Sequence, residues 1–107
     1  LPGVLAKAGV KVALCTDHPT IPVAYLAVQA ALAVRDGMPE DDALRAITIV
    51  AADVLGVADR IGSIEVGKDA DLAIFSGHPF DVTTKTTMTL VDGEIAYQAP
   101  KGGCCTC

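Results

Sequence analysis

Residues 60–72 read RIGSIEVGKDADL, and this stretch marks the place where the pattern of the chain changes. Upstream of it the sequence is rich in alanine, whereas downstream it is rich in glycine, threonine and aspartate. Within the stretch, Gly67-Lys68 reads as a turn between two short segments of β character, at residues 62–64 and 71–75. The stretch therefore predicts the start of a β-rich region.

The rest of the β-rich region carries a hairpin signal. Residues 85–91 and 94–98 have β character and flank Asp92-Gly93, a pair that suits a two-residue turn because both positions favour positive φ. No repeat or low-complexity linker is present, so we place the boundary near residues 58–62. This division predicts one region at 1–59, a β-rich region at 60–98 and a disordered tail at 99–107.

The upstream region alternates helix and strand. Residues 1–9 read as the end of a helix capped by Gly9, and residues 10–15 read as a strand covered on both faces, as in a parallel sheet. A helix follows from Pro22 to Arg35 and ends at Asp36-Gly37. The order predicts an α/β arrangement.

A second helix is predicted from Pro39 to Gly56. Proline suits a first helical position, and acidic side chains in the first turn face the positive end of the helix dipole. The acids are Glu40, Asp41 and Asp42, and the expected buried stripe is Leu44, Ile47, Ala51, Val54 and Leu55.

The predicted strand at 10–15 ends in polar residues, in the sequence LCTDHP at 14–19. Functional groups in α/β sheets and barrels collect at the carboxyl ends of parallel strands, which is where Asp17 falls. A carboxylate there can ligate a metal ion whose bound water becomes a nucleophile. Alternatively, Asp17 caps the next helix or closes an Asx turn before Pro19. The hexapeptide alone leaves both interpretations open.

Composition narrows the classes of partner. Thirteen acids against eight bases give a net charge of −5, which disfavours nucleic acid and anionic membranes because their phosphates would be repelled. The longest apolar run, at residues 21–34, is too short to cross a bilayer, and no signal sequence precedes it. These features predict an acidic, soluble protein of the cytoplasmic type.

The cysteines are unevenly placed. Cys15 lies in an apolar run and reads as a buried thiol of a reducing compartment. Cys104, Cys105 and Cys107 crowd the tail, which lacks a second ligand pair at a zinc-finger spacing. We interpret the tail as a frayed or artefactual end rather than a site for a soft metal.

The stretch at 60–72 resembles the G-S-I-x-x-G-K-x-A-D-L signature of the amidohydrolase superfamily of metal-dependent hydrolases, and is most similar to its imidazolonepropionase-like members. Three further matches extend the resemblance over residues 4–98. Residues 43–56 fit the pattern A-L-x-x-x-T-x-x-x-A-x-x-L-G, with Val50-Ala51 where the family often has Asn-Pro or Asn-Ala, and residues 91–93 fit V-D-G. Thr16-Asp17 fits the family's T-D motif.

The resemblance implies a fold. It is that of a C-terminal fragment of a (β/α)8 TIM-barrel hydrolase, comprising the last strand and its helices, followed by part of a small β-sandwich composite domain. The remainder of the barrel would be required as a partner, and a homo-oligomer is left open.

The resemblance also implies a reaction and a site. The reaction is hydrolysis of a carbon–nitrogen bond other than a peptide bond, in a cyclic amide or amidine. Asp17 would ligate a divalent metal, zinc or alternatively iron or manganese, and would shuttle the proton of the attacking water to the leaving nitrogen. His18 would bind substrate or support the metal site, although a loop role is equally consistent with the sequence.

Other polar residues are assigned structural roles. His78 is placed in a turn of the β domain, and Lys68, Asp69 and Asp71 are assigned to the turn and strand they surround rather than to chemistry. The sequence contains no His-x-His pair, so the other ligands that the family uses are absent and one aspartate cannot hold the metal. We therefore expect the isolated chain to bind metal weakly and to be inactive.

Two alternatives to an enzyme fragment remain. The chain could serve as a non-catalytic binding or assembly module that keeps the amidohydrolase fold, or its parent could be a catalytically dead relative. An upstream His-x-His pair would favour the enzyme.

Overall fold

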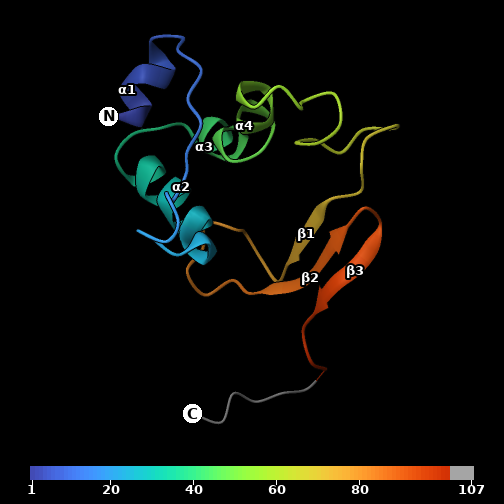
Figure 1. Ribbon diagram of the computed structural model, residues 1–107. Helices are drawn as coiled ribbons and strands as arrows, with labels where there is room; N and C mark the ends of the chain where they lie inside the picture. Colours follow the sequence, from blue (N-terminus) through green and yellow to red (C-terminus); the bar gives the residue numbers. More distant parts are fainter. Residues whose placement is uncertain (102–107) are drawn as a thin grey trace.

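A computed structural model of the chain describes residues 1–101, in which a group of short helices lies beside a small antiparallel sheet (Figure 1). Among the helices, α3 (Glu40–Ala46) packs against both α2 (Leu26–Arg35) and α4 (Ile49–Val54). No helix within residues 1–101 is long and apolar enough to cross a membrane. The elements are α1 (Pro2–Lys7), η1 (Val23–Tyr25), α2 (Leu26–Arg35), α3 (Glu40–Ala46), α4 (Ile49–Val54), β1 (Leu72–Phe75), β2 (Thr86–Val91) and β3 (Glu94–Gln98).

The boundaries of α2 and α3 follow the sequence signals. Helix α2 ends at Arg35, and Gly37 has a φ of +106°, which a residue without a Cβ adopts easily. Pro39 is the residue that caps α3, and the three acids predicted for the first turn of this helix occupy it. Both starts differ slightly from the prediction. Val23–Tyr25 forms a turn of 3-10 helix before α2, and Pro39 precedes the first helical residue of α3 instead of occupying that position.

The predicted single helix from Pro39 to Gly56 is wrong, because the structure divides it into α3 and α4. The break lies at Ile47 and Thr48, where the backbone of Thr48 leaves the helical region with φ −129° and ψ −103°. The Thr48 hydroxyl donates a hydrogen bond to the carbonyl oxygen of Leu44 at 2.7 Å. A side chain that bonds to the backbone in this way competes with the regular helical pattern, which accounts for the break.

The division also shifts the buried face. Leu44, Val54 and Leu55, which were expected in the buried stripe, are 40%, 58% and 76% exposed. The buried positions of these two helices are alanines, and Ile47 and Ala51 are half-buried. The buried alanines are Ala43, Ala46 and Ala52.

The core between α2 and α3 consists of small side chains and one methionine. Small residues let helix backbones approach closely, so shape rather than apolar area determines this packing. Gly3 of α1 completes the contact, because a Cβ on it would lie 2.9 Å from the backbone nitrogen of Met38. The cluster, here named the alanine core, is Ala30, Ala33, Met38, Ala43 and Ala46, with Ala6, Leu14, Val34, Ile47 and Phe80 packed against it.

Residues 10–15 do not form the predicted strand. A parallel strand is defined by hydrogen bonds to neighbouring strands, and no strand within residues 1–101 pairs with this segment. It is instead attached to α3, since the backbone N–H of Leu14 donates to the carbonyl oxygen of Ala46 at 3.1 Å. Cys15 is exposed, which corrects its interpretation as a buried thiol. Gly9, with a φ of +80°, follows α1 as predicted.

The sheet has the order β1-β2-β3 with both pairs antiparallel. The predicted hairpin is confirmed, since Asp92 and Gly93 join β2 to β3 with φ values of +52° and +78°. Residues 62–64 were expected to have β character and form no strand. They belong instead to the segment between α4 and β1, residues 55–71, here named the linker. Within it, Gly62 packs against Ile49 and Ala52 of α4.

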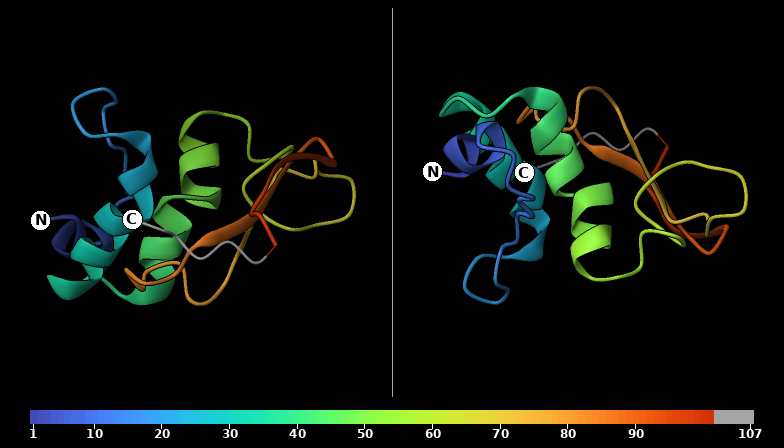
Figure 2. Two further views of the ribbon diagram at one scale, coloured as in Figure 1. Left: turned by 90° about the horizontal axis from the view of Figure 1, so that it is seen from below. Right: turned by 90° about the horizontal axis from the view of Figure 1, so that it is seen from above.

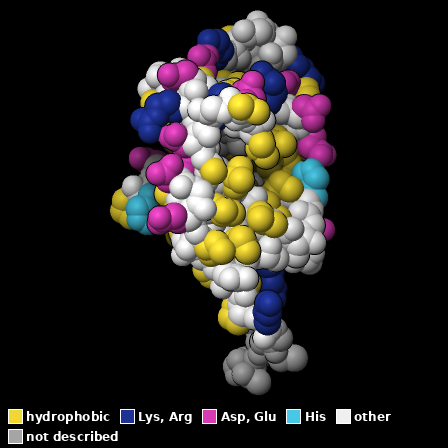
Figure 3. Space-filling model, turned by 90° about the vertical axis from the view of Figure 1, so that its right-hand side faces the viewer, with side chains coloured by type: hydrophobic (Ala, Val, Ile, Leu, Met, Phe, Trp, Pro, Cys, Tyr) yellow, Lys and Arg dark blue, Asp and Glu magenta, His cyan; other side chains and the backbone are white. Residues whose placement is uncertain are grey.

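Large apolar side chains remain exposed on the sheet and on the linker before it. Figure 3 shows hydrophobic side chains gathered on the face that lies at the right of Figure 1. Leu72 is half-buried as predicted for the β core, whereas Ile74 is 46% exposed. The exposed apolar residues of this region include Ile64, Val66, Ile74, Ile95 and Tyr97.

Most of the predicted tail, including Cys104, Cys105 and Cys107, lies outside the described residues. Of the part that is described, Ala99 continues the sheet, because its N–H donates to the carbonyl oxygen of Thr87 at 2.8 Å. The division into regions at 1–59 and 60–98 stays a prediction.

Candidate active-site segment

Asp17 lies in a tight turn directly after the segment that α3 holds. Its φ is +52°, and its backbone carbonyl accepts a hydrogen bond from the N–H of Thr20 at 2.8 Å, across a cis peptide bond between His18 and Pro19. Thr16 is buried at 6% exposure, whereas Asp17 is exposed. The chain therefore anchors the residue before Asp17 and presents Asp17 itself to solvent.

The two structural interpretations of Asp17 are wrong. Tyr25 and Pro22 are the cap residues of α2 and η1, so Asp17 caps neither helix. Thr20 bonds to the backbone oxygen of Asp17 rather than to its carboxylate, so no Asx turn is formed. Among the described residues, the Asp17 carboxylate accepts no hydrogen bond, which leaves it available to a ligand.

Both histidines of the chain precede a proline, but the structure does not place His18 and His78 together in one group of possible metal ligands. His18 is exposed beside Asp17 in the turn, and its predicted role toward substrate stays a prediction. His78 lies between β1 and β2, where its Nδ1 accepts the N–H of Phe80 at 3.1 Å and its Nε2 lies 2.7 Å from Glu40 Oε1. The bond to Phe80 confirms a turn role for His78.

The polar residues of the linker bind one another. Lys68 Nζ, with its side chain 12% exposed, donates to the carbonyl oxygen of Ala58 at 2.6 Å and to Ser63 Oγ at 2.7 Å, and it lies 2.9 Å from Glu65 Oε2. The Ser63 hydroxyl also donates to the Glu65 carboxylate. The bonds from Ser63 and then Lys68 hold the pKa of Glu65 below its usual value.

Two aspartates near the linker likewise have structural partners. Asp69 pairs with Arg60 at 2.8 Å between Oδ2 and the guanidinium. Asp71 Oδ1 accepts the backbone N–H of Asp92 at 2.8 Å and so ties the start of β1 to the hairpin turn. These contacts give Lys68, Asp69 and Asp71 structural partners, as the sequence interpretation expects.

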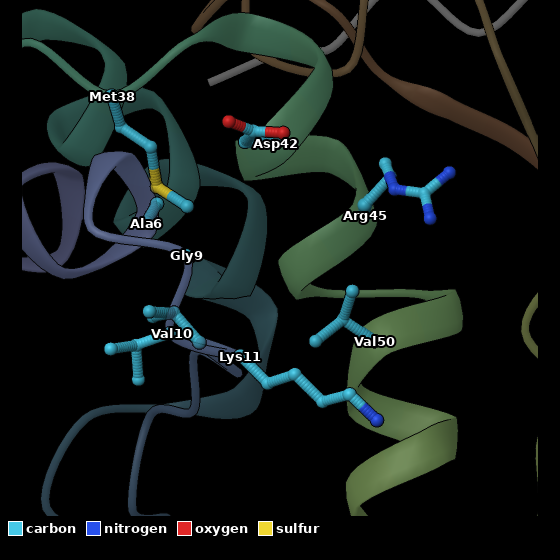
Figure 4. A pocket seen from close by; sticks show the side chains of 9 residues that line it. Ala6, Gly9, Val10, Lys11, Met38, Asp42, Arg45 and Val50 are labelled. Carbon is cyan, nitrogen blue, oxygen red and sulfur yellow. The ribbon is translucent and has the colours of Figure 1, made fainter.

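A cavity of about 200 Å³ lies at the other end of the 10–15 segment from Asp17 (Figure 4). Its wall joins the end of α1 to α3 and α4, and its charged members are Lys11, Asp42 and Arg45. Lys11 also forms an ion pair with Asp53. Asp17 does not line this cavity, so the cavity is separate from the candidate site.

Residues 1–101 contain no group of three or more histidine, cysteine, aspartate or glutamate side chains placed to hold a metal ion. A metal site normally needs at least three protein ligands, and the oxygen of one carboxylate is a suitable ligand but not a complete set. The described residues could therefore supply part of a metal site, but not a complete set of ligands.

Comparison with known proteins identifies the family. A family model described as "Amidohydrolase family" matches residues 1–100. The chain belongs to this family. This amidohydrolase chain also has a solved structural neighbour, an amidohydrolase from Thermotoga maritima, with 48% sequence identity and a TM-score of 0.86 over 89% of this chain and 25% of that one.

Curated relatives agree with this assignment. The amidohydrolase chain is 43% identical to an imidazolonepropionase from Geobacillus kaustophilus, over 67% of this chain and 18% of the relative. It is 33% identical to an N-substituted formamide deformylase from Arthrobacter pascens, over 88% of this chain and 20% of the relative. The chain therefore spans about a fifth of the length of these two relatives.

Sequence reasoning missed one set of contacts, those of Phe80. Its aromatic side chain was not singled out, yet it packs against the alanine core from the loop between β1 and β2. An aromatic residue inside a polar stretch, GHPFDVTT, was the available signal.

Proposed function

We propose that this chain forms the C-terminal part of a metal-dependent amidohydrolase that hydrolyses a carbon–nitrogen bond other than a peptide bond. The family match supports hydrolysis, and the relative named N-substituted formamide deformylase is named for action on a formamide. We propose a cyclic amide or amidine as the substrate class, because the imidazolonepropionase relative is named for a ring compound.

The observation that carries the proposal is the environment of the Asp17 carboxylate. Its carboxylate is exposed, free of hydrogen bonds from residues 1–101, and held in a turn after a fixed segment. Unlike Asp71, Asp17 does not use its oxygens to bind the nearby backbone, and unlike the equally exposed Asp59 it directly follows the segment that α3 holds. A carboxylate on a fixed backbone turn with unused oxygens is suited to bind a metal or to accept a proton.

The remaining ligands would come from residues beyond this chain. A divalent metal, zinc or alternatively iron or manganese, would supply the Lewis acid that lowers the pKa of the attacking water. Asp17 would provide one oxygen ligand, take the proton of that water and pass it to the leaving nitrogen. His18 would lie beside the substrate from the same turn.

The architecture proposed with this function is the last strand and helices of a (β/α)8 barrel for residues 1–59 and part of a composite β-sandwich for residues 60–98. In that setting the 10–15 segment would pair with neighbouring barrel strands, which would make it the strand that the sequence predicts. We also propose a cytoplasmic enzyme acting on small molecules.

The test is Asp17→Asn in the intact enzyme that contains this sequence. We expect turnover to fall by about 10²- to 10⁴-fold, because an amide cannot accept the proton. Folding should be unchanged, because no described contact is lost. Asp59→Asn, an exposed acid without a described partner, is the matched control and should keep full activity. Undiminished turnover by Asp17→Asn would remove Asp17 from the mechanism.

The alternative function is a non-catalytic binding or assembly module that keeps the amidohydrolase fold. An intact protein that retains no divalent metal after dialysis would favour this alternative.

A further inference from the structure

The loop between β1 and β2, residues 76–85, joins the sheet to the helices. This segment, here named the latch loop, leaves the sheet and lies beside the helices in both views of Figure 2. Neither the family signature nor the proposed function assigns it a role. Its contacts are specific enough to suggest one.

The latch loop is held in shape by its own hydrogen bonds. At its base, Ser76 N–H donates to the Lys85 carbonyl oxygen at 2.9 Å, and Lys85 N–H donates to Ser76 Oγ at 3.0 Å. At its tip, Asp81 Oδ1 accepts hydrogen bonds from the backbone N–H of Thr83 at 3.0 Å and from the Thr83 hydroxyl at 2.9 Å. These two bonds hold the pKa of Asp81 below its usual value. The loop therefore presents its remaining side chains in one arrangement.

Two of those side chains reach the helices together. Phe80 packs against the alanine core, and His78 Nε2 lies 2.7 Å from Glu40 Oε1 in the first turn of α3. Because His78 Nδ1 accepts the N–H of Phe80, the ring proton lies on Nε2 and is donated to Glu40. The His78 and Phe80 rings also meet edge to face, with centroids 5.2 Å apart.

The opposite end of α3 holds the segment that leads to Asp17. The last residue of this helix, Ala46, accepts the N–H of Leu14 at 3.1 Å, and the Leu14 side chain packs against the same alanine core as Phe80. Asp17 follows three residues later. Helix α3 is thus fixed at its first turn by the latch loop and supports the Asp17 segment at its last residue.

We propose that Phe80 and His78 are positioning residues for Asp17, acting through α3 and the alanine core. Closely packed small side chains transmit a displacement rather than absorb it, since the interior has few voids to collapse into. A shift of α3 at its latch-loop end therefore moves the carbonyl that holds Leu14. What Asp17 does once positioned rests on the proposed function, but the mechanical connection does not.

Amide hydrogen exchange by NMR on the chain tests the connection. Phe80→Ala should raise the exchange rate of the Leu14 amide by roughly tenfold and shift the Asp17 and Thr20 resonances. The amide of Gly93, which bonds to Ala70 outside this connection, should change far less. Phe80→Leu, which keeps the apolar bulk, should restore most of the protection.

Matched variants separate this effect from general loosening. Val82→Ala changes an 84% exposed residue of the same loop and should leave the Leu14 exchange rate unchanged. His78→Ala and Glu40→Ala each remove one partner of a single exposed pair and should raise the Leu14 rate by a smaller factor, about twofold, without a further increase in the double variant. These two variants also keep the test usable if Phe80→Ala does not fold.

Two results would overturn the proposal: an unchanged Leu14 exchange rate in Phe80→Ala, or an equal rise at Leu14 and Gly93. Activity gives a separate readout in the intact enzyme. There Phe80→Ala should lower kcat more than it raises KM, with Phe80→Leu restoring kcat. If Asp17→Asn is fully active while Phe80→Ala still raises the exchange rate of the Leu14 amide, the proposed function is wrong, but the connection from the latch loop to the Asp17 segment is supported.

Discussion

Gly62 and Gly67 form a natural matched pair for measuring the cost of the contact between the linker and α4. Both glycines have nearly the same backbone conformation, with φ values of +95° and +92°. They differ in surroundings, because a Cβ on Gly62 would lie 2.8 Å from Ala52 Cβ and 2.9 Å from Ile49 Cα, whereas a Cβ on Gly67 would meet nothing within 4 Å. Replacing each by alanine therefore separates the conformational cost from the steric cost.

The expected magnitudes follow from these surroundings. Alanine in the left-handed region costs about 1–2 kcal/mol, partly offset by about 0.4–1 kcal/mol from the reduced freedom of the unfolded chain. Gly67→Ala should therefore lower the free energy of unfolding by about 1 kcal/mol. Gly62→Ala has the same terms and adds about 1–3 kcal/mol of overpacking, because the Ile49 contact is backbone and cannot rotate away. We expect a total loss of about 2–4 kcal/mol.

Urea unfolding monitored by circular dichroism measures both variants, with equal m-values as the condition for comparing them. The reasoning is refuted if Gly62→Ala and Gly67→Ala lose the same stability, since the linker would then not pack against α4 as the structure has it. In a double-mutant cycle, Ala52→Gly combined with Gly62→Ala should lose less stability than the sum of the two single variants, because it removes the closer clashing atom, whereas glycine within α4 by itself costs about 1 kcal/mol.

Two further predictions concern hydrogen bonds of the β-rich part. Asp71→Ala should destabilise the β2–β3 hairpin by about 1 kcal/mol because it removes the acceptor of the Asp92 N–H, whereas Asp71→Asn, which keeps an oxygen there, should recover most of it in the same unfolding assay. A loss shared equally by both variants would contradict this role. The side-chain bonds from Ser63 and Lys68 lower the pKa of Glu65. The stability that these bonds supply is therefore present above the ordinary glutamate pKa, and it is lost as the pH falls through the lowered pKa of Glu65. A carboxyl carbon titration by NMR should therefore give a Glu65 midpoint below the ordinary glutamate value, and Ser63→Ala should raise it; an unmoved midpoint in that variant would show that Ser63 is not the cause.

Local signals in the sequence predicted the elements that depend on local chemistry. Asp92-Gly93 formed the hairpin turn because the required φ values are properties of the residues themselves. The acids of α3 and the glycine after α2 likewise mark helix ends through backbone chemistry that operates within one turn. These predictions needed no knowledge of distant neighbours.

The errors have two causes: one is dependence on contacts that are distant in sequence, and the other is a local side-chain bond. Residues 10–15 have the composition of a buried strand, but pairing needs partner strands that residues 1–101 do not provide beside them. The helix after Pro39 broke at Thr48 through a side-chain bond to Leu44 that periodicity does not reveal. Asp17 was placed by resemblance, and only the structure shows that its carboxylate is unused by the described residues.

The alanine core also defines which substitutions the chain can accept. At its four buried alanines the side chain is already the smallest that carries a Cβ, so a larger side chain fits there only if a helix moves. A valine at Ala43 or Ala46 would push α2 and α3 apart. This displacement would change the contacts of both Leu14 and Phe80 with the alanine core. Variants at these positions, though far from any reactive group in sequence, should therefore be read as changes to the geometry around Asp17 and not as neutral changes of the interior.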